Sequence, residues 1–164
     1  MDYLLHQEQT SSSGNVHNGF VSEAGLEPIH PRVIVVEDNE DDAAITMRGL
    51  GKVYPTLLVD LIVDGASAIT RLTDREAERP ELVFLDLKLP KVNGLDVLAA
   101  IRSAGATKEL PVVVFTSSDE PRDVSRAREL GCIAYLTKPI DWDEYIRLVC
   151  QTAAGLIPGA RCLP

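Results

Sequence analysis

The sequence has few cysteines, no long hydrophobic run and no segment typical of protein export. The three cysteines, Cys132, Cys150 and Cys162, are odd in number and match no zinc-binding spacing. We interpret them as reduced thiols, as expected in a cytoplasmic protein. No apolar run approaches the about 18 residues that a membrane span requires, and the N-terminus lacks the cationic start and apolar core of a signal peptide. A cytoplasmic protein without a membrane-embedded part is therefore predicted.

Basic residues are fewer than acidic ones, and the formal net charge is −9. Residues 1–31 contain four acidic residues but no lysine or arginine. An acidic surface repels phosphate backbones, so nucleic-acid binding is not expected. No glycine-rich phosphate loop follows the first predicted strand, which argues against nucleotide binding of the Rossmann or Walker kind.

The chain divides into three parts by composition. Residues 1–30 are polar and aperiodic, and we expect either a flexible extension or a partner-binding arm. Residues 31–154 predict one domain. Residues 155–164 are short, apolar and interrupted by proline and glycine, so they predict a loose tail or an arm that crosses to a dimer partner, but no output domain. The histidines near the N-terminus are too scattered to predict a metal site: His6, His17 and His30.

Five short apolar runs alternate with helical patterns in the domain, which predicts a doubly wound parallel sheet with helices on both faces. The expected strands are 32–36, 57–63, 82–85, 111–115 and 133–136. The expected helices are 41–52, 66–76, 95–103, a fourth capped by Ser118 or Asp119 and ended by Gly131, and a fifth from Asp141. Inward-facing positions are expected at Ile45, Met47 and Leu50 in the first helix and at Trp142, Tyr145, Ile146, Val149 and Ala153 in the last.

Polar side chains follow four of the expected strands, at the edge where ligands bind in open α/β sheets. Glu37 and Asp38 follow the first strand, Asp86 the third, Thr116 the fourth and Lys138 the fifth. Three carboxylates without imidazole or thiol suit Mg²⁺. A lysine and a hydroxyl suit phosphate oxygens, and the central carboxylate is then a candidate nucleophile towards phosphorus. The acidic positions from residue 39 to 42 have a simpler interpretation, which is capping of the following helix.

The motifs together resemble those of a response-regulator receiver domain, in the order and spacing of that family, over about residues 32–154. The resemblance implies the flavodoxin-like fold with strand order 2-1-3-4-5. It also implies that a histidine kinase phosphorylates the protein and that the only catalysis concerns its own phosphorylation and dephosphorylation. The matching segments are Val35–Asn39, Leu85–Pro90, Asn93–Gly94, Phe115–Ser118 and Tyr135–Pro139.

The resemblance also implies roles for individual residues. Asp86 corresponds to the phosphoacceptor, and Glu37 and Asp38 to the acidic metal pair. The remaining correspondences are the backbone carbonyl of Lys88 as a further metal ligand, Thr116 and Tyr135 as the switch pair, Lys138 as the phosphate-contacting lysine, and a cis peptide bond before Pro139.

More narrowly, the sequence is similar to single-domain regulators paired with bacterial phytochromes. This similarity implies a red-light sensor kinase as phosphodonor and a homodimer, formed through the fourth helix, fifth strand and last helix or through the tail. Glu37 and Ser117 depart from the commonest receiver pattern, and Ser117 leaves the lifetime of the phosphate open. Signals would leave by protein contacts or onward phosphotransfer.

Two other functions compete with this interpretation. A pseudo-receiver would be an interaction module that never takes phosphate, although none of the acidic or lysine positions is lost. A Mg²⁺-dependent phosphohydrolase would usually carry its nucleophile on the first strand in an Asp-x-Asp element, whereas Asp86 follows the third.

Overall fold

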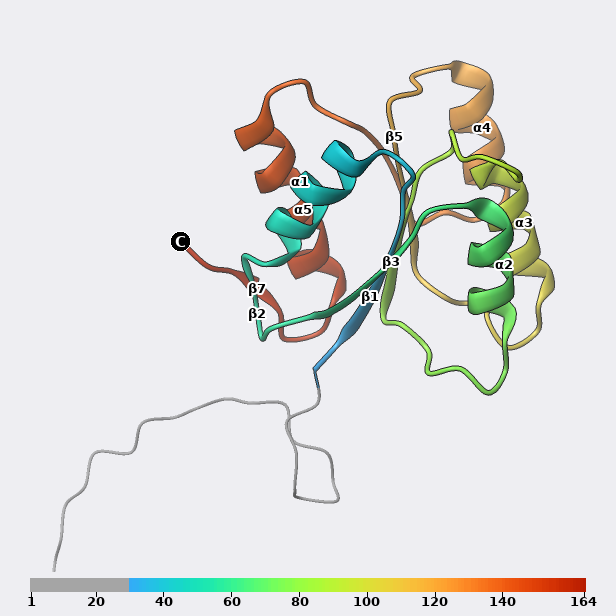
Figure 1. Cartoon of the computed structure of the whole chain (residues 1–164), viewed down its shortest axis with the longest axis horizontal. Coiled ribbons are helices and arrows are strands. Elements are labelled where there is room, and N and C mark those ends of the chain that lie inside the picture. The colour runs from blue at the N-terminus through green and yellow to red at the C-terminus, as the bar shows by residue number, and fades with distance from the viewer. Residues whose placement is uncertain (1–29) are drawn as a thin grey trace, which may run out of the picture.

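A computed structural model describes residues 30–164, so the expectations for the N-terminal extension, including those for His6 and His17, lie outside the described residues. Figure 1 shows a twisted central sheet nearly edge-on, with α1 and α5 on one face and α2, α3 and α4 on the other. This arrangement confirms the predicted doubly wound architecture.

The central sheet contains five parallel strands in the order β3-β1-β4-β5-β6. Counted within this sheet, the order is 2-1-3-4-5, as expected for the flavodoxin-like fold. Two strands match their predicted limits to the residue because their apolar runs are buried throughout. The strands are β1 (Arg32–Val36), β3 (Leu58–Ile62), β4 (Leu82–Leu85), β5 (Val112–Thr116) and β6 (Ala134–Thr137).

Side-chain caps begin four of the five helices of the described chain. Asn39, Asp64, Asn93 and Asp141 each accept a hydrogen bond from a backbone N–H in the first turn. The fourth helix differs, because its N-cap Glu120 makes no such bond, and the predicted caps at Ser118 and Asp119 are wrong. A proline in its first turn replaces the cap, since proline has no N–H to satisfy there. The helices are α1 (Glu40–Leu50), α2 (Gly65–Thr73), α3 (Gly94–Ser103), α4 (Pro121–Glu129) and α5 (Trp142–Leu156).

The core has one layer on each face of the sheet. On the α1–α5 side, the rings of Phe84, Phe115 and Tyr145 stack edge to face, with centroids 6.0 and 4.8 Å apart.

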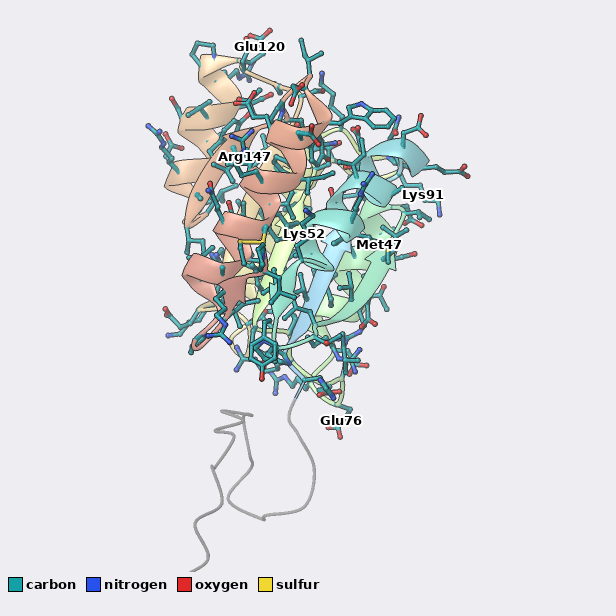
Figure 2. All side chains as sticks on the ribbon, turned by 90° about the vertical axis from the view of Figure 1, so that its left-hand side faces the viewer. Met47, Lys52, Glu76, Lys91, Glu120 and Arg147 are labelled. Atoms are coloured by element: carbon teal, nitrogen blue, oxygen red, sulfur yellow. A yellow bond between two sulfur atoms is a disulfide. The ribbon has the colours of Figure 1, made fainter. Side chains whose placement is uncertain are left out.

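Two residues that were predicted to face inward on the α1–α5 side are exposed instead. Met47 is 41% exposed, because the buried face of α1 is formed by Ala43, Thr46, Gly49 and Leu50 instead. Trp142 is 64% exposed at the first residue of α5, whose buried residues begin at Tyr145. Met47 also appears at the surface in Figure 2.

A second, two-stranded sheet was not expected from the sequence. The strands β2 (Val53–Tyr54) and β7 (Arg161–Cys162) pair antiparallel, so the chain after α5 packs on its own domain. Each of these strands is only two residues long, which is too short to show the alternation of apolar and polar residues that predicts a strand.

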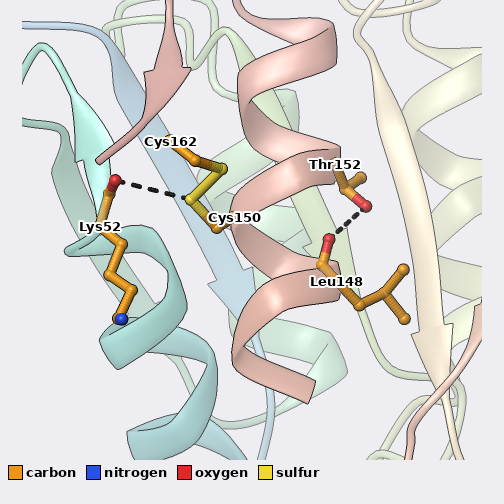
Figure 3. Close-up of a disulfide and its surroundings, with 5 residues drawn as sticks. All are labelled: Lys52, Leu148, Cys150, Thr152 and Cys162. Atoms are coloured by element: carbon orange, nitrogen blue, oxygen red, sulfur yellow. Dashed lines mark hydrogen bonds between the residues drawn. A yellow bond between two sulfur atoms is a disulfide. The ribbon is translucent and has the colours of Figure 1, made fainter. Parts of the chain in front are cut away.

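The pairing of β2 with β7 places Cys162 beside α5, where it forms a disulfide with Cys150 (Figure 3). The Cα atoms lie 5.8 Å apart, within the usual range for a disulfide. The prediction of reduced thiols is therefore wrong for these two cysteines, because cysteine number and spacing do not reveal a contact made by chain folding. Cys132 is free.

The prediction of a cis bond before Pro139 is also wrong, since the cis peptide bond of the described chain precedes Pro55. The two isomers of an X–Pro bond differ by only about 0.5–1 kcal/mol, so local sequence does not decide between them. Across residues 30–164, every helix is too short or too polar to span a bilayer.

Candidate functional site

The predicted site residues come together at the carboxyl edge of the sheet because backbone hydrogen bonds continue past the strand ends. The N–H of Asp86 donates to the carbonyl of Val36 at 3.0 Å, and the N–H of Lys138 donates to the carbonyl of Thr116 at 2.8 Å. The residues after β1, β4 and β6 and the last residue of β5 are thereby held side by side. Asp86 and Thr116 are buried.

Lys138 is the centre of the site. Its Nζ lies 2.6 Å from Glu37 Oε2, 2.8 Å from Asp42 Oδ2 and 3.1 Å from Asp86 Oδ2, and its side chain is only 6% exposed. Burial alone would lower the pKa of Lys138, but hydrogen bonds to Asp42 and Glu37 and the charges of Asp86 and Glu37 outweigh it and raise the pKa. The lysine is therefore charged at neutral pH.

Glu37 has an unusual environment for a carboxylate. Burial raises its pKa to about 7, although Lys138 and the N–H of Asn39, 3.1 Å from Oε1, oppose the shift. Burial thus makes the ionised form of Glu37 costly, and a further cation close to it would favour ionisation.

Three carboxylates of this edge lie close enough together to share one ion. Oxygen atoms of Glu37, Asp38 and Asp86 lie within 4.8 Å of one another. Two oxygens on opposite sides of one Mg²⁺ would be about 4.2 Å apart, given metal–oxygen distances of about 2.1 Å. Small side-chain rotations would suffice, and the all-oxygen donor set suits a hard divalent cation.

The loop after Asp86 is fixed by close backbone packing. The N–H of Gly94 donates to the carbonyl of Leu87 at 2.9 Å, and a Cβ on Gly94 would overlap the carbonyl of Asp86. The N–H of Lys88 donates to Asp86 Oδ1 at 3.3 Å, and its Nζ lies 3.2 Å from Ser117 Oγ. Lys88 thus connects the Asp86 carboxylate to the loop after β5, while the role of its carbonyl as a metal ligand stays a prediction.

Lys91 completes this loop with a backbone φ of 66°. Its Nζ lies 2.9 Å from Asp64 Oδ2. The N–H of Ser67 and the Lys91 ammonium lower the pKa of Asp64 to about 2. The start of α2 is thereby tied to the loop that carries the site.

Thr116 and Tyr135 both contact Ser118. Thr116 Oγ1 accepts a hydrogen bond from the N–H of Ser118 at 3.3 Å, and the hydroxyl of Tyr135 donates to the carbonyl of Ser118 at 2.9 Å. Ser118 Oγ also lies 2.6 Å from Asp123 Oδ2 in α4. Movement of Thr116 would therefore disturb the residue that holds the tyrosine.

Asp42 is a site residue that sequence reasoning missed, because its position also suits helix capping. It is the third residue of α1 and belongs to the acidic run that directly follows β1. Its place in that run was the available signal. The carbonyl of Asp42 accepts a hydrogen bond from Tyr145 at 3.3 Å, and the Tyr145 hydroxyl lies 3.0 Å from Thr46 Oγ1. Burial raises the pKa of Tyr145 to about 12.

This fold and this edge of carboxylates and lysine define a receiver domain, and the sequence of residues 33–149 matches the family described as the response regulator receiver domain. The chain belongs to that family.

Individual relatives and solved structures show which members of the family this chain is similar to. The chain is 36% identical over 126 residues to response regulator Rcp1 of Synechocystis sp., which covers 73% of this chain and 84% of Rcp1. A structure of the phosphorylated cyanobacterial phytochrome response regulator RcpA superposes with a TM-score of 0.75 at 30% identity, over 79% of this chain and 96% of RcpA. The Mn²⁺-bound form of Rcp1 gives a TM-score of 0.74 at 30% identity, over 82% and 99%.

Proposed function

We propose that the protein accepts a phosphoryl group from a sensor histidine kinase on Asp86, with Mg²⁺, and passes the signal on by protein contacts or phosphotransfer. The observation that carries the proposal is the buried Asp86 carboxylate, which lies 3.1 Å from Lys138 Nζ and beside the carboxylates of Glu37 and Asp38. In this proposal the protein is a phosphoacceptor that catalyses only its own phosphorylation and dephosphorylation.

In the proposed reaction, an Asp86 oxygen attacks the phosphorus of a phosphohistidine. The phosphorus–nitrogen bond breaks, and the imidazole leaves and takes up a proton. Lys138 can hold a phosphoryl oxygen because its ammonium is already at the Asp86 carboxylate. The fixed loop around Gly94 keeps the nucleophile in place, and positioning supplies much of the rate in phosphoryl transfer.

Glu37, Asp38 and Asp86, with the Lys88 carbonyl, would hold the metal. Mg²⁺ supplies charge neutralisation of the phosphoryl oxygens when bound. It would also favour the ionised form of Glu37, whose raised pKa reflects the burial of a carboxylate. Related structures support a divalent cation here, since one form of Rcp1 carries Mn²⁺.

Thr116 and Tyr135 form the proposed switch. A phosphoryl group on Asp86 would draw the Thr116 hydroxyl away from the N–H of Ser118. The loop that holds the Tyr135 hydroxyl would then rearrange, and the surface of α4, β6 and α5 would change. That surface, or the C-terminal tail, is the proposed homodimer contact.

A phytochrome-type kinase is the proposed phosphodonor. The support is the likeness to Rcp1 and RcpA, and RcpA is described as a phytochrome response regulator. A second supporting relative is the bacteriophytochrome response regulator RtBRR, at 35% identity and a TM-score of 0.64 over 79% of this chain.

Intact-mass spectrometry after incubation with Mg²⁺ and phosphoramidate tests the phosphoacceptor. One added phosphoryl group is expected on the wild type, none on Asp86→Asn and none without Mg²⁺. Asp74→Asn is the matched control, because Asp74 is an exposed carboxylate at the end of α2, and it should accept phosphate normally. Absence of any adduct, together with failure to bind beryllofluoride, would identify a pseudo-receiver.

The donor is tested separately with autophosphorylated kinases. Transfer to Asp86 from a bacteriophytochrome kinase should exceed transfer from a histidine kinase without a photosensor, and it should change with red illumination. Equal transfer from both kinases would refute the donor and leave the phosphoacceptor intact.

A further inference from the structure

The Cys150–Cys162 disulfide lies beside a cavity of about 320 Å³ between α1 and α5. Both cysteines line this cavity, with Arg48, Lys52 and Arg147 and one acid, Asp143. Figure 2 shows Lys52 and Arg147 on this face of the molecule. Among residues 30–164, none of the three cations forms an ion pair. A protein with a net charge of −9 therefore carries a local positive pocket around its disulfide.

The two cysteine residues differ in exposure. Cys162 is exposed in the terminal strand, whereas Cys150 in α5 is 3% exposed. Cys150 Sγ lies 3.5 Å from the carbonyl oxygen of Lys52, as Figure 3 shows. A thiol at Cys150 could donate to this carbonyl, so the buried side of the bond has a hydrogen-bond partner ready for the reduced form.

Little besides the disulfide holds the terminal strand. After the buried Ile157, the strand β7 makes two residue pairs with β2, and Leu163 donates to the carbonyl of Lys52 at 2.7 Å. The guanidinium of Arg161 lies 5.0 Å from the ring centre of Tyr54. Two-stranded ribbons of this length are marginal in water without a further constraint.

We propose that this pocket is a thiol–disulfide exchange site for small anionic thiols, and that exchange at Cys162 releases the β7 strand. The thiolate attacks the sulfur of Cys162, the exposed residue of the pair, a mixed disulfide forms there, and the bond to Cys150 breaks. Cys150 leaves as a thiolate and takes a proton from water. A second small-molecule thiolate then attacks the small-molecule sulfur of the mixed disulfide, and Cys162 leaves as a thiolate. The products are two protein thiols and one small-molecule disulfide, so the two small-molecule thiols supply both electrons.

The charge preference is the discriminating property of this site. We would compare mercaptoethanesulfonate, mercaptoethanol and cysteamine, which share a two-carbon skeleton and differ in charge. Rates of disulfide loss, expressed per thiolate, should fall in that order, by at least about tenfold between the ends at low salt. The difference should shrink as salt is added. Each rate is divided by the rate of the same thiolate with an uncharged small-molecule disulfide, because the ammonium of cysteamine lowers its thiol pKa and thereby the nucleophilicity of its thiolate. The net charge of the whole protein favours the cationic thiol, so an anionic preference in these relative rates reports the pocket.

Arg147→Gln should reduce the preference for the anionic thiol, since it removes one exposed cation of the pocket. The matched control is Arg122→Gln, which removes an exposed arginine from α4 on the other face of the sheet and should leave the preference unchanged. Both variants keep the disulfide, so loss of preference in Arg147→Gln does not depend on a change of fold.

Release of the strand is read from hydrogen exchange at Leu163, whose N–H is protected by Lys52 in the closed form. Reduction, or Cys162→Ser, should accelerate this exchange by about tenfold or more, with α5 unchanged before Cys150. Three results would overturn the proposal: alkylation of all three cysteines in the native, unreduced protein, equal rates for the three thiols, or a protected Leu163 after reduction.

Discussion

The close contact between α1 and α5 predicts that Gly49→Ala lowers the stability of the protein, although alanine is usually favoured over glycine in a helix. A Cβ at this position would lie 2.8 and 2.9 Å from Cβ and Cγ1 of Val149 and 3.0 Å from the carbonyl oxygen of Ile146. Carbon atoms normally approach to about 3.5–4.0 Å. Val149 is buried and β-branched, and the carbonyl belongs to the backbone, so neither neighbour yields easily.

The expected net loss of stability follows from two opposing effects. Alanine in a helix interior is favoured over glycine by about 1 kcal/mol. Overpacking of a well-filled core costs about 1–3 kcal/mol, and rigid neighbours place this site in the upper half of that range. Gly49→Ala should therefore lower the free energy of unfolding by about 1–2 kcal/mol, measured by urea denaturation with an unchanged m-value.

Gly155→Ala is the matched control, because a Cβ there meets nothing within 4 Å near the end of α5. This variant should be as stable as the wild type or gain up to about 1 kcal/mol. The double variant Gly49→Ala with Val149→Ala should lose less than the sum of the two single changes, since the smaller side chain makes room. If Gly49→Ala proves as stable as Gly155→Ala, the argument from close helix packing is refuted.

Three further results are expected. The folded pKa of Asp64 is lowered, so its charge stabilises the fold above the ordinary pKa of 3.8, and this contribution is lost as pH falls to about 2. The urea midpoint of Asp64→Asn should thus lie below that of wild type near neutral pH and converge with it in acid. Tyr135→Phe, which loses the bond to Ser118, should cost about 0.5–1.5 kcal/mol in the same assay, and a neutral effect would contradict the contact. Cys162→Ser opens a covalent loop that spans 12 positions and should cost up to about 3 kcal/mol, while an unchanged midpoint under non-reducing conditions would show that the loop contributes nothing.

Short buried strands were the most predictable part of the molecule. Arg32–Val36 and Leu82–Leu85 are apolar runs with polar residues directly after them, so their ends and the placement of Glu37 and Asp86 follow from local sequence. The parallel arrangement then brings side chains from distant strands to one edge, which is why a site could be predicted from four separate motifs.

Features that depend on contacts between distant parts of the chain were less predictable. Asp42 reaches Lys138 across 96 positions, and nothing in the acidic run distinguishes a residue that caps a helix from one that binds a lysine. Helical periodicity identified the buried face of α5 but not the point at which the face begins, so Trp142 was misassigned. The disulfide depended on the pairing of two short strands that have no sequence signature of their own.

Helix α5 connects the proposed phosphorylation site to the proposed thiol–disulfide exchange site. Tyr145 contacts the backbone of Asp42 beside Lys138, and five residues later, about 7.5 Å along the axis, Cys150 holds the terminal strand. Any free energy that couples the two ends acts equally in both directions. If phosphorylation changes the midpoint reduction potential of the disulfide, the size of that change therefore also gives the effect of disulfide reduction on the phosphorylation equilibrium.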